Sequence, residues 1–188
     1  MTLRLLPITI AVLALLIGRP AHAQDGAPMF DVFGGYSLLP SNFNEDFPRR
    51  TSHGVQGSVA VHVNRWLAVV GDAGTQWNTT TDLGPNFEGL TARTRVTELL
   101  VGPRFTARSP RVDGFVHAWF GTAIGSTNED FRGFADSGMT FGGGAGVDLR
   151  VSPRAAVRVQ YDLIGSFADI VEGNSRLGAG LVWRMGQR

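Results

Sequence analysis

The stretch GVQGSVAVHVNRWLAVVGDAG, residues Gly54–Gly74, decides the fold of this chain. Its apolar side chains alternate with small or polar ones, and the alternation resumes after a short polar link at Asn64-Arg65. A period of two residues is typical of a β-strand, and two such runs joined by a very short link predict a β-hairpin. Each strand has one apolar face and one small or polar face, so the fold depends on which face points inward.

The same alternation defines eight runs along the chain, most of them close to the length that crosses a membrane when tilted. The expected strands cover residues 29–39, 54–64, 66–77, 93–107, 114–125, 140–151, 155–163 and 175–185. Long connections alternate strictly with short ones, the long ones being 40–53, 78–92, 126–138 and 164–174. This plan is typical of an up-and-down membrane barrel, with both chain ends on the side of the short turns.

The N-terminal segment has the pattern of a secretory signal peptide. Arg4 precedes an almost wholly apolar run over residues 5–17, and Ala21-His22-Ala23 forms a small-x-small site. We expect cleavage after Ala23, which makes residues 1–23 the signal peptide and residues 24–188 the barrel domain. The sequence has no cysteine, so it predicts neither a disulfide framework nor a lipid-modified cysteine.

Three features favour a barrel with its apolar face toward lipid over a soluble barrel or sandwich. The polar face has no lysine, which water-exposed strands normally use in quantity. Glycines alternate within several strands, as expected where side chains converge in a narrow lumen. Aromatic residues gather near the ends of the runs, like the belts at the two headgroup layers of a bilayer. The girdle is expected to contain Tyr36, Trp66, Trp77, Phe105, Phe115, Phe141 and Trp183.

The sequence therefore predicts an all-β, eight-stranded antiparallel up-and-down transmembrane β-barrel. A barrel of eight strands has an interior just wide enough to be filled by side chains. We expect that interior to hold a structural network of opposite charges, because unpaired charges there would be costly. Its expected members are Asp31, His62, Asp72, Glu98, Arg104, His117, Asp148, Arg158, Asp162 and Arg176.

Four segments resemble the small outer-membrane β-barrel domain family, which includes the barrel half of outer membrane protein A. They are MFDVFGGYSLL, ELLVGPRF, FGGGAGVDLRVSPRAAVRVQYDLIG and RLGAGLVWRMG, and the resemblance covers essentially all of residues 24–188. It implies the fold and the outer membrane as location. Barrels of this family commonly end in an aromatic residue, whereas this sequence places Trp183 five residues before its last residue, Arg188.

The sequence suggests no catalytic, cofactor or metal site. His62 and His117, together with Glu98, raise the possibility of acid–base work, but neither histidine stands in the His-x-Ser pattern that would supply a nucleophile. Two acidic motifs, NEDF at residues 44–47 and again at 128–131, fall in long connections. They are either soluble loop tips, the interpretation we favour, or sites for Ca²⁺ or for divalent ions that bridge to lipopolysaccharide phosphates.

We expect a non-enzymatic outer-membrane protein of a Gram-negative bacterium, with a structural or surface-interaction role for four extracellular loops. The alternatives are a narrow pore, a lipid-modifying barrel enzyme and a soluble ligand-binding barrel. Expected partners are outer-membrane lipid, lipopolysaccharide, the barrel-insertion machinery and periplasmic chaperones; the sequence names no extracellular partner. Nucleic acid is not expected, because loss of Arg4 and Arg19 from the 17 basic residues leaves 15 against 16 acidic ones.

Overall fold

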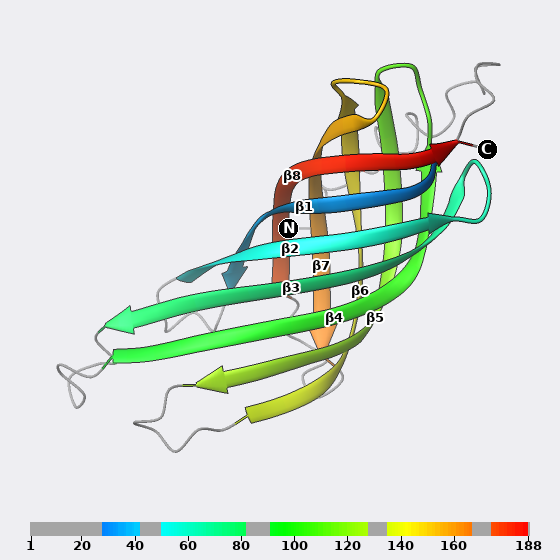
Figure 1. Ribbon diagram of the computed structural model, residues 1–188. Helices are drawn as coiled ribbons and strands as arrows, with labels where there is room; N and C mark the ends of the chain where they lie inside the picture. Colours follow the sequence, from blue (N-terminus) through cyan, green and yellow to red (C-terminus); the bar gives the residue numbers. More distant parts are fainter. Residues whose placement is uncertain (1–27, 42–49, 82–90, 128–134, 167–173, 188) are drawn as a thin grey trace, which may run out of the picture.

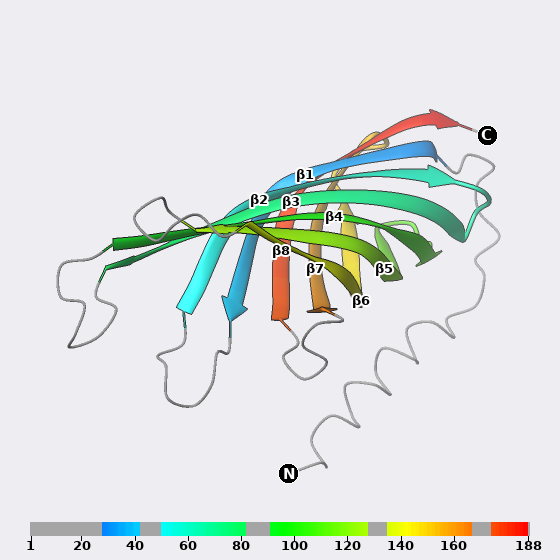
Figure 2. The same ribbon diagram turned by 90° about the horizontal axis from the view of Figure 1, so that it is seen from below.

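The computed structural model describes residues 28–41, 50–81, 91–127, 135–166 and 174–187, which form eight β-strands. Each strand is antiparallel to its two neighbours, and the order β1 to β8 closes into a barrel because β8 pairs with β1 (Figures 1 and 2). The strands are β1 Pro28–Ser41, β2 Arg50–His62, β3 Leu67–Thr81, β4 Thr91–Ala107, β5 Val112–Thr127, β6 Ala135–Arg150, β7 Ala155–Ser166 and β8 Asn174–Gln187.

The eight predicted strands are confirmed, and most extend past their predicted ends. The predicted strand at 140–151 covers Ala135–Arg150, and the one at 114–125 begins earlier, at Val112. None of the described residues forms a helix long and apolar enough to cross a membrane. The predicted signal peptide and both NEDF motifs lie outside the described residues.

Short turns at residues 63–66, 108–111 and 151–154 join the strands at one end of the barrel. Asn64 and Ser152 organise two of these turns, because each side-chain oxygen accepts hydrogen bonds from the backbone N–H groups two and three residues later in the sequence. Pro28 pairs with Gln187, so the first and the last described residues lie at the same end of the barrel as the short turns. The four long connections all join strands at the opposite end.

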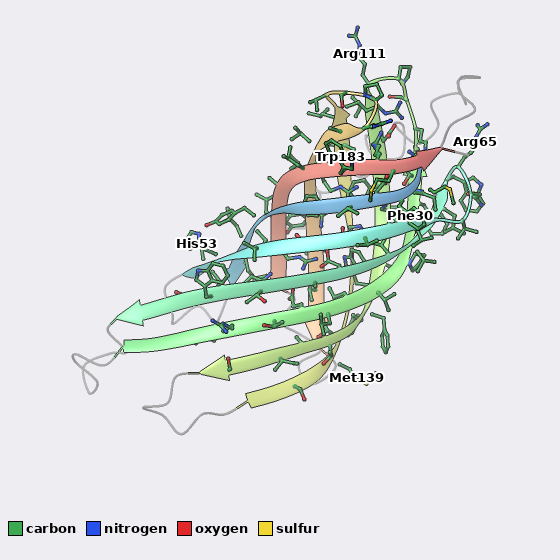
Figure 3. The ribbon with its side chains drawn as sticks, in the orientation of Figure 1. Phe30, His53, Arg65, Arg111, Met139 and Trp183 are labelled. Carbon is green, nitrogen blue, oxygen red and sulfur yellow. The ribbon has the colours of Figure 1, made fainter. Side chains whose placement is uncertain are left out.

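The apolar face of each strand points outward, which confirms the expected orientation (Figure 3). In the opening hairpin, Val59 and Val69 are about half exposed, whereas Ser58 and Asp72 are buried in the interior. A soluble barrel would show the reverse arrangement. Closure of the sheet pairs its backbone groups without an exposed edge, which is the condition for a β-sheet in lipid.

Glycines on the inner face leave room for strands and side chains that come very close together. A Cβ at Gly102 would collide with the backbone carbonyl of Ala118 on β5. A Cβ at Gly178 would lie only 2.8 Å from Gln56 Oε1. Small apolar clusters fill the remaining interior; they comprise Ala60, Ala68, Val70, Leu100, Trp119 and Ile164 in one and Phe33, Ala156 and Val182 in the other.

Candidate functional site in the barrel interior

Arg176 on β8 is fully buried and contacts three carboxylates. The distances from its guanidinium nitrogens are 3.0 Å to Asp72 Oδ1, 2.9 Å to Glu98 Oε2 and 2.8 Å to Asp162 Oδ2. These acids come from β3, β4 and β7. Because β4 lies directly across the closed barrel from β8, and β3 directly across from β7, the cluster spans the lumen in two directions.

Polar side chains from two further strands join this cluster. His117 on β5 places Nε2 2.6 Å from Asp162 Oδ1, and its ring lies 4.2 Å from that of Trp119, measured between centroids. The Gln56 amide on β2 donates to Asp72 over 2.7 Å. The acids therefore contact Gln56 and His117 as well as Arg176, as buried charges require.

A second cluster crosses the lumen through Arg158 on β7. Its guanidinium donates two hydrogen bonds to Asp148 on β6, at 2.7 and 2.9 Å. Its Cζ atom also lies 5.1 Å from the ring centroid of Phe33 and 4.6 Å from that of Phe115, which is within the range of a cation–π contact. Phe33 on β1 and Phe115 on β5 come from opposite walls, so this aromatic–guanidinium layer also spans the barrel.

Asp31 on β1 holds a third group of charges. Its Oδ2 lies 2.8 Å from His62 Nε2 and accepts a 2.9 Å hydrogen bond from Arg104 on β4. The Arg104 Cζ atom lies 5.1 Å from the centroid of the Phe115 ring, so Phe115 contacts two guanidinium groups. Phe115 thus joins the Asp31 group to the Arg158 cluster, and its ring centroid lies 5.6 Å from that of His117 in the Arg176 cluster.

Asp113 anchors the charges nearest to the short turns. Its fully buried carboxylate accepts hydrogen bonds from Arg150 at 2.7 and 3.0 Å and lies 2.8 Å from Arg184 Nη2. Arg108 Nη1 lies 3.6 Å from Asp113 Oδ2. Burial lowers the pKa of Arg108 below its ordinary value, and the nearby negative charge of Asp113 opposes that shift only in part. The backbone N–H of Ser109 also donates to Asp113, which links this cluster to the turn at 108–111.

The structure places all ten residues that were predicted for the lumen inside the barrel, each nine-tenths buried or more. Sequence reasoning did not place Phe33, Asp113 or Trp119 in the interior. Phe33 contacts Arg158, Trp119 contacts His117, and Asp113 pairs with Arg184, which also contacts Asp148. Their strand parity was the available signal: Phe33 is two residues from Asp31, and Trp119 is two residues from His117. Side chains two apart on a strand share a face.

Six of the seven residues predicted for the aromatic girdle lie on the outer surface, with 39 to 55% of their surface exposed: Tyr36, Trp66, Trp77, Phe105, Phe141 and Trp183. The prediction for Phe115 was wrong, since only 3% of this residue is exposed. Phe115 shares its parity with Asp113 and His117, so β5 turns its ring inward. Its position near the end of a strand suggested a girdle residue, but the alternation along the strand decides whether a side chain points to the lipid or to the lumen.

The interior histidines lack a nucleophile in the described part of the chain. His62 contacts Asp31 and Arg108, and His117 contacts Asp162; neither ring makes a hydrogen bond to a hydroxyl group. Among the described strands and turns, no cluster of three potential ligand side chains is arranged to hold a metal. The arrangement is suited to filling and cross-linking the lumen.

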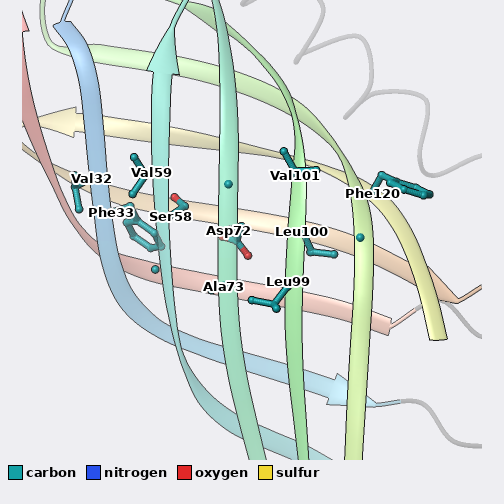
Figure 4. Close-up of a pocket in the computed structure, with 13 residues that line it drawn as sticks. Val32, Phe33, Ser58, Val59, Asp72, Ala73, Leu99, Leu100, Val101 and Phe120 are labelled. Atoms are coloured by element: carbon teal, nitrogen blue, oxygen red, sulfur yellow. The ribbon is translucent and has the colours of Figure 1, made fainter. Parts of the chain in front are cut away.

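The outer surface carries a shallow apolar groove of about 720 Å³ over β1 to β5 (Figure 4). Gly57, Gly71 and Ala73 line the groove, and their small size leaves the space that larger side chains would fill. Val59 and Leu99 are among the apolar side chains at its edges. The groove lies on the lipid-facing side, so hydrocarbon is its natural filling.

Solved structures similar to this chain include three bacterial proteins. Neisserial surface protein A has a TM-score of 0.66 at 12% identity, with 86% of this chain and 100% of that chain covered. Ail, the attachment invasion locus protein of Yersinia pestis, has a TM-score of 0.56 at 14% identity, with 82% and 97% covered. The N-terminal β-barrel domain of Pseudomonas aeruginosa OprF has a TM-score of 0.54 at 12% identity, with 84% and 98% covered.

These identities support a shared fold and no more than that. None of the curated proteins compared with the chain matches it. The sequence does match the family described as outer membrane protein beta-barrel domain over residues 9–184, which is most of the chain. With its closed eight-stranded barrel and lipid-facing apolar surface, the protein lies in the bacterial outer membrane and belongs to the outer membrane protein β-barrel domain family.

Proposed function

We propose that the protein is a non-conducting outer-membrane barrel whose interior serves as a rigid plug and whose four long connections provide its extracellular interaction surface. The observation that carries the proposal is the contact of Arg176 with acids from three other strands, including Glu98 on the opposite wall. Buried ion pairs that cross the lumen support a plug, because an ion at that level would have to pass or displace them. Rigid barrels with variable loops are suited to recognition, because loops tolerate change that the scaffold does not.

The phenylalanine–arginine layer supports the same conclusion. Arg158 lies between Phe33 and Phe115, and all three side chains are almost completely buried. An ion that crossed the barrel would have to displace this layer as well as the Arg176 cluster. Two separate obstructions make a constitutive pore the less favoured function.

Conductance across a planar lipid bilayer tests the plug. The purified barrel is inserted at neutral pH, and the Arg176→Ala variant is inserted as a comparison. We expect no discrete openings from the natural protein. Steady, reproducible steps from the natural protein would contradict the plug and establish the narrow pore.

The role of the loops is tested by shortening them. A variant with its four long connections replaced by two-residue Asn-Gly turns keeps the strands and the lumen cluster, and its folding is checked by gel mobility before and after boiling. We expect cells that carry the natural protein to bind host-surface or abiotic matrices better than cells that carry the shortened variant. Equal binding by both, with both barrels folded, would contradict the proposed interaction role.

A further inference from the structure

The short-turn end of the barrel carries an exposed arginine in each of its turns. The three residues are Arg65 in the turn at 63–66, Arg111 in the turn at 108–111 and Arg154 in the turn at 151–154. None of them makes an ion pair with another described residue. Figure 3 shows the Arg65 and Arg111 side chains extending beyond the turns at this end. We call these three side chains the arginine rim.

The backbone of each rim residue is held in place by another arginine. Arg108 Nε donates a 2.9 Å hydrogen bond to the carbonyl of Arg65. The backbone N–H of Arg150 donates to the carbonyl of Arg111 over 2.9 Å, and that of Arg184 to the carbonyl of Arg154 over 2.8 Å. The rim is therefore anchored in the barrel wall, while its guanidinium groups remain exposed.

No acidic side chain in the described part of this end offsets the rim charge. Asp113 is the carboxylate closest to the turns, and it is fully buried. Its contacts with Arg108, Arg150 and Arg184 already supply more positive than negative charge. Among the described residues, the exposed surface of this end therefore presents positive charge without a facing carboxylate.

The aromatic residues beside the arginine rim indicate which layer of the membrane the rim contacts. Trp66 directly follows Arg65, is 55% exposed and stacks on Phe105 with ring centroids 5.7 Å apart. Arg154 directly precedes Ala155, which pairs with the exposed Trp183 on β8. Exposed indole rings of membrane proteins gather at the headgroup layer. Arg65 and Arg154 each stand one residue from these indole-bearing positions, on the side of the turns, where lipid phosphates are expected.

We propose that the arginine rim binds the phosphates of anionic phospholipids in the periplasmic leaflet of the outer membrane. The guanidinium group suits this ligand, because its planar N–H fork binds phosphate oxygens in a bidentate way. The turns are only four residues long, which keeps the rim close to the ends of the strands and therefore to the membrane surface. This proposal is independent of the extracellular loops and of the plug.

The test uses the folded full barrel in zwitterionic phosphocholine micelles, titrated with short-chain phosphatidylglycerol. Nitrogen-15 NMR follows the Nε–H signals of the rim arginines. We expect these signals to shift with phosphatidylglycerol and to stay unchanged with short-chain phosphatidylcholine. The variant with Arg65→Gln, Arg111→Gln and Arg154→Gln should bind phosphatidylglycerol at least about tenfold more weakly, since each basic residue near an anionic surface contributes about fivefold.

Arg95→Gln is the matched control, because Arg95 is an exposed arginine near the opposite end of the barrel. This variant should bind phosphatidylglycerol as the natural protein does. The proposal is overturned if the triple variant binds unchanged, if Arg95→Gln loses as much affinity, or if phosphatidylcholine gives the same shifts. Equal shifts with inorganic phosphate would show an unspecific anion site, and tighter binding of a soluble peptidoglycan fragment would show a cell-wall site; each result overturns the assignment to lipid.

Discussion

Arg176 Nη1 and Glu98 Oε2 lie 2.9 Å apart, although the strands that carry them, β8 and β4, stand on opposite sides of the barrel. The two residues are 78 positions apart in the sequence. This contact can form only after the barrel has closed. The interior network therefore reports on closure itself, and its disruption should be visible as a loss of stability.

Replacement of Arg176 by alanine should lower the free energy of unfolding by about 3–5 kcal/mol, because it leaves buried carboxylates without their cation. Denaturant unfolding in lipid vesicles, followed by tryptophan fluorescence, measures the change. The exposed Arg95→Ala serves as the control and should stay within about 0.5 kcal/mol of the natural protein. Similar losses in both variants would contradict the central place of Arg176.

Replacement of Glu98 by glutamine should have a smaller effect, below about 1.5 kcal/mol. Arg176 keeps Asp72 and Asp162 as partners, and the glutamine carbonyl still accepts a hydrogen bond. The same unfolding experiment ranks the two variants. A loss for Glu98→Gln as large as that for Arg176→Ala would mean that the contact across the lumen, and not the set of three acids, carries the stability.

Two glycines of neighbouring strands should respond in opposite ways to alanine. At Gly102 the new Cβ would meet the backbone carbonyl of Ala118, and such overpacking costs about 1–3 kcal/mol. At Gly71 no atom lies within 4 Å of the new Cβ, so Gly71→Ala should be neutral or slightly stabilising. The fraction of protein that migrates as the folded form in unheated gels compares the variants. The account fails at this point if Gly71→Ala is the more damaging change.

Alternation and loop lengths were sufficient to predict the strand number, the closure and the direction of most side chains. The opening hairpin is the clearest case, because Val59 and Ser58 point to opposite sides as the period of two requires. Phe115 shows where a second criterion misled: closeness to a strand end suggested the girdle, whereas its parity with His117 predicted the lumen. Asp113 was missed because the strand was expected to begin at residue 114, whereas β5 begins at Val112.

The sequence alone could not predict which charged residues pair with each other in the lumen. Asp148 and Arg158 are direct cross-strand neighbours, so a known register would have predicted that pair. Arg104 and Asp31, in contrast, are 73 residues apart on strands that are not adjacent. Their contact depends on the stagger of the closed barrel, which no local pattern records.

The orientation of the side chains is the central claim, and tryptophan quenching by lipids brominated high on the acyl chain tests it most directly. Two single-tryptophan variants are compared in vesicles, one that retains Trp183 and one that retains Trp119, with the other tryptophans replaced by phenylalanine. Trp183 is 55% exposed on the outer surface and Trp119 only 4% exposed in the interior. We predict strong quenching of Trp183 and little of Trp119; equal quenching, or stronger quenching of Trp119, would contradict a barrel with its apolar face toward lipid and its charges inside.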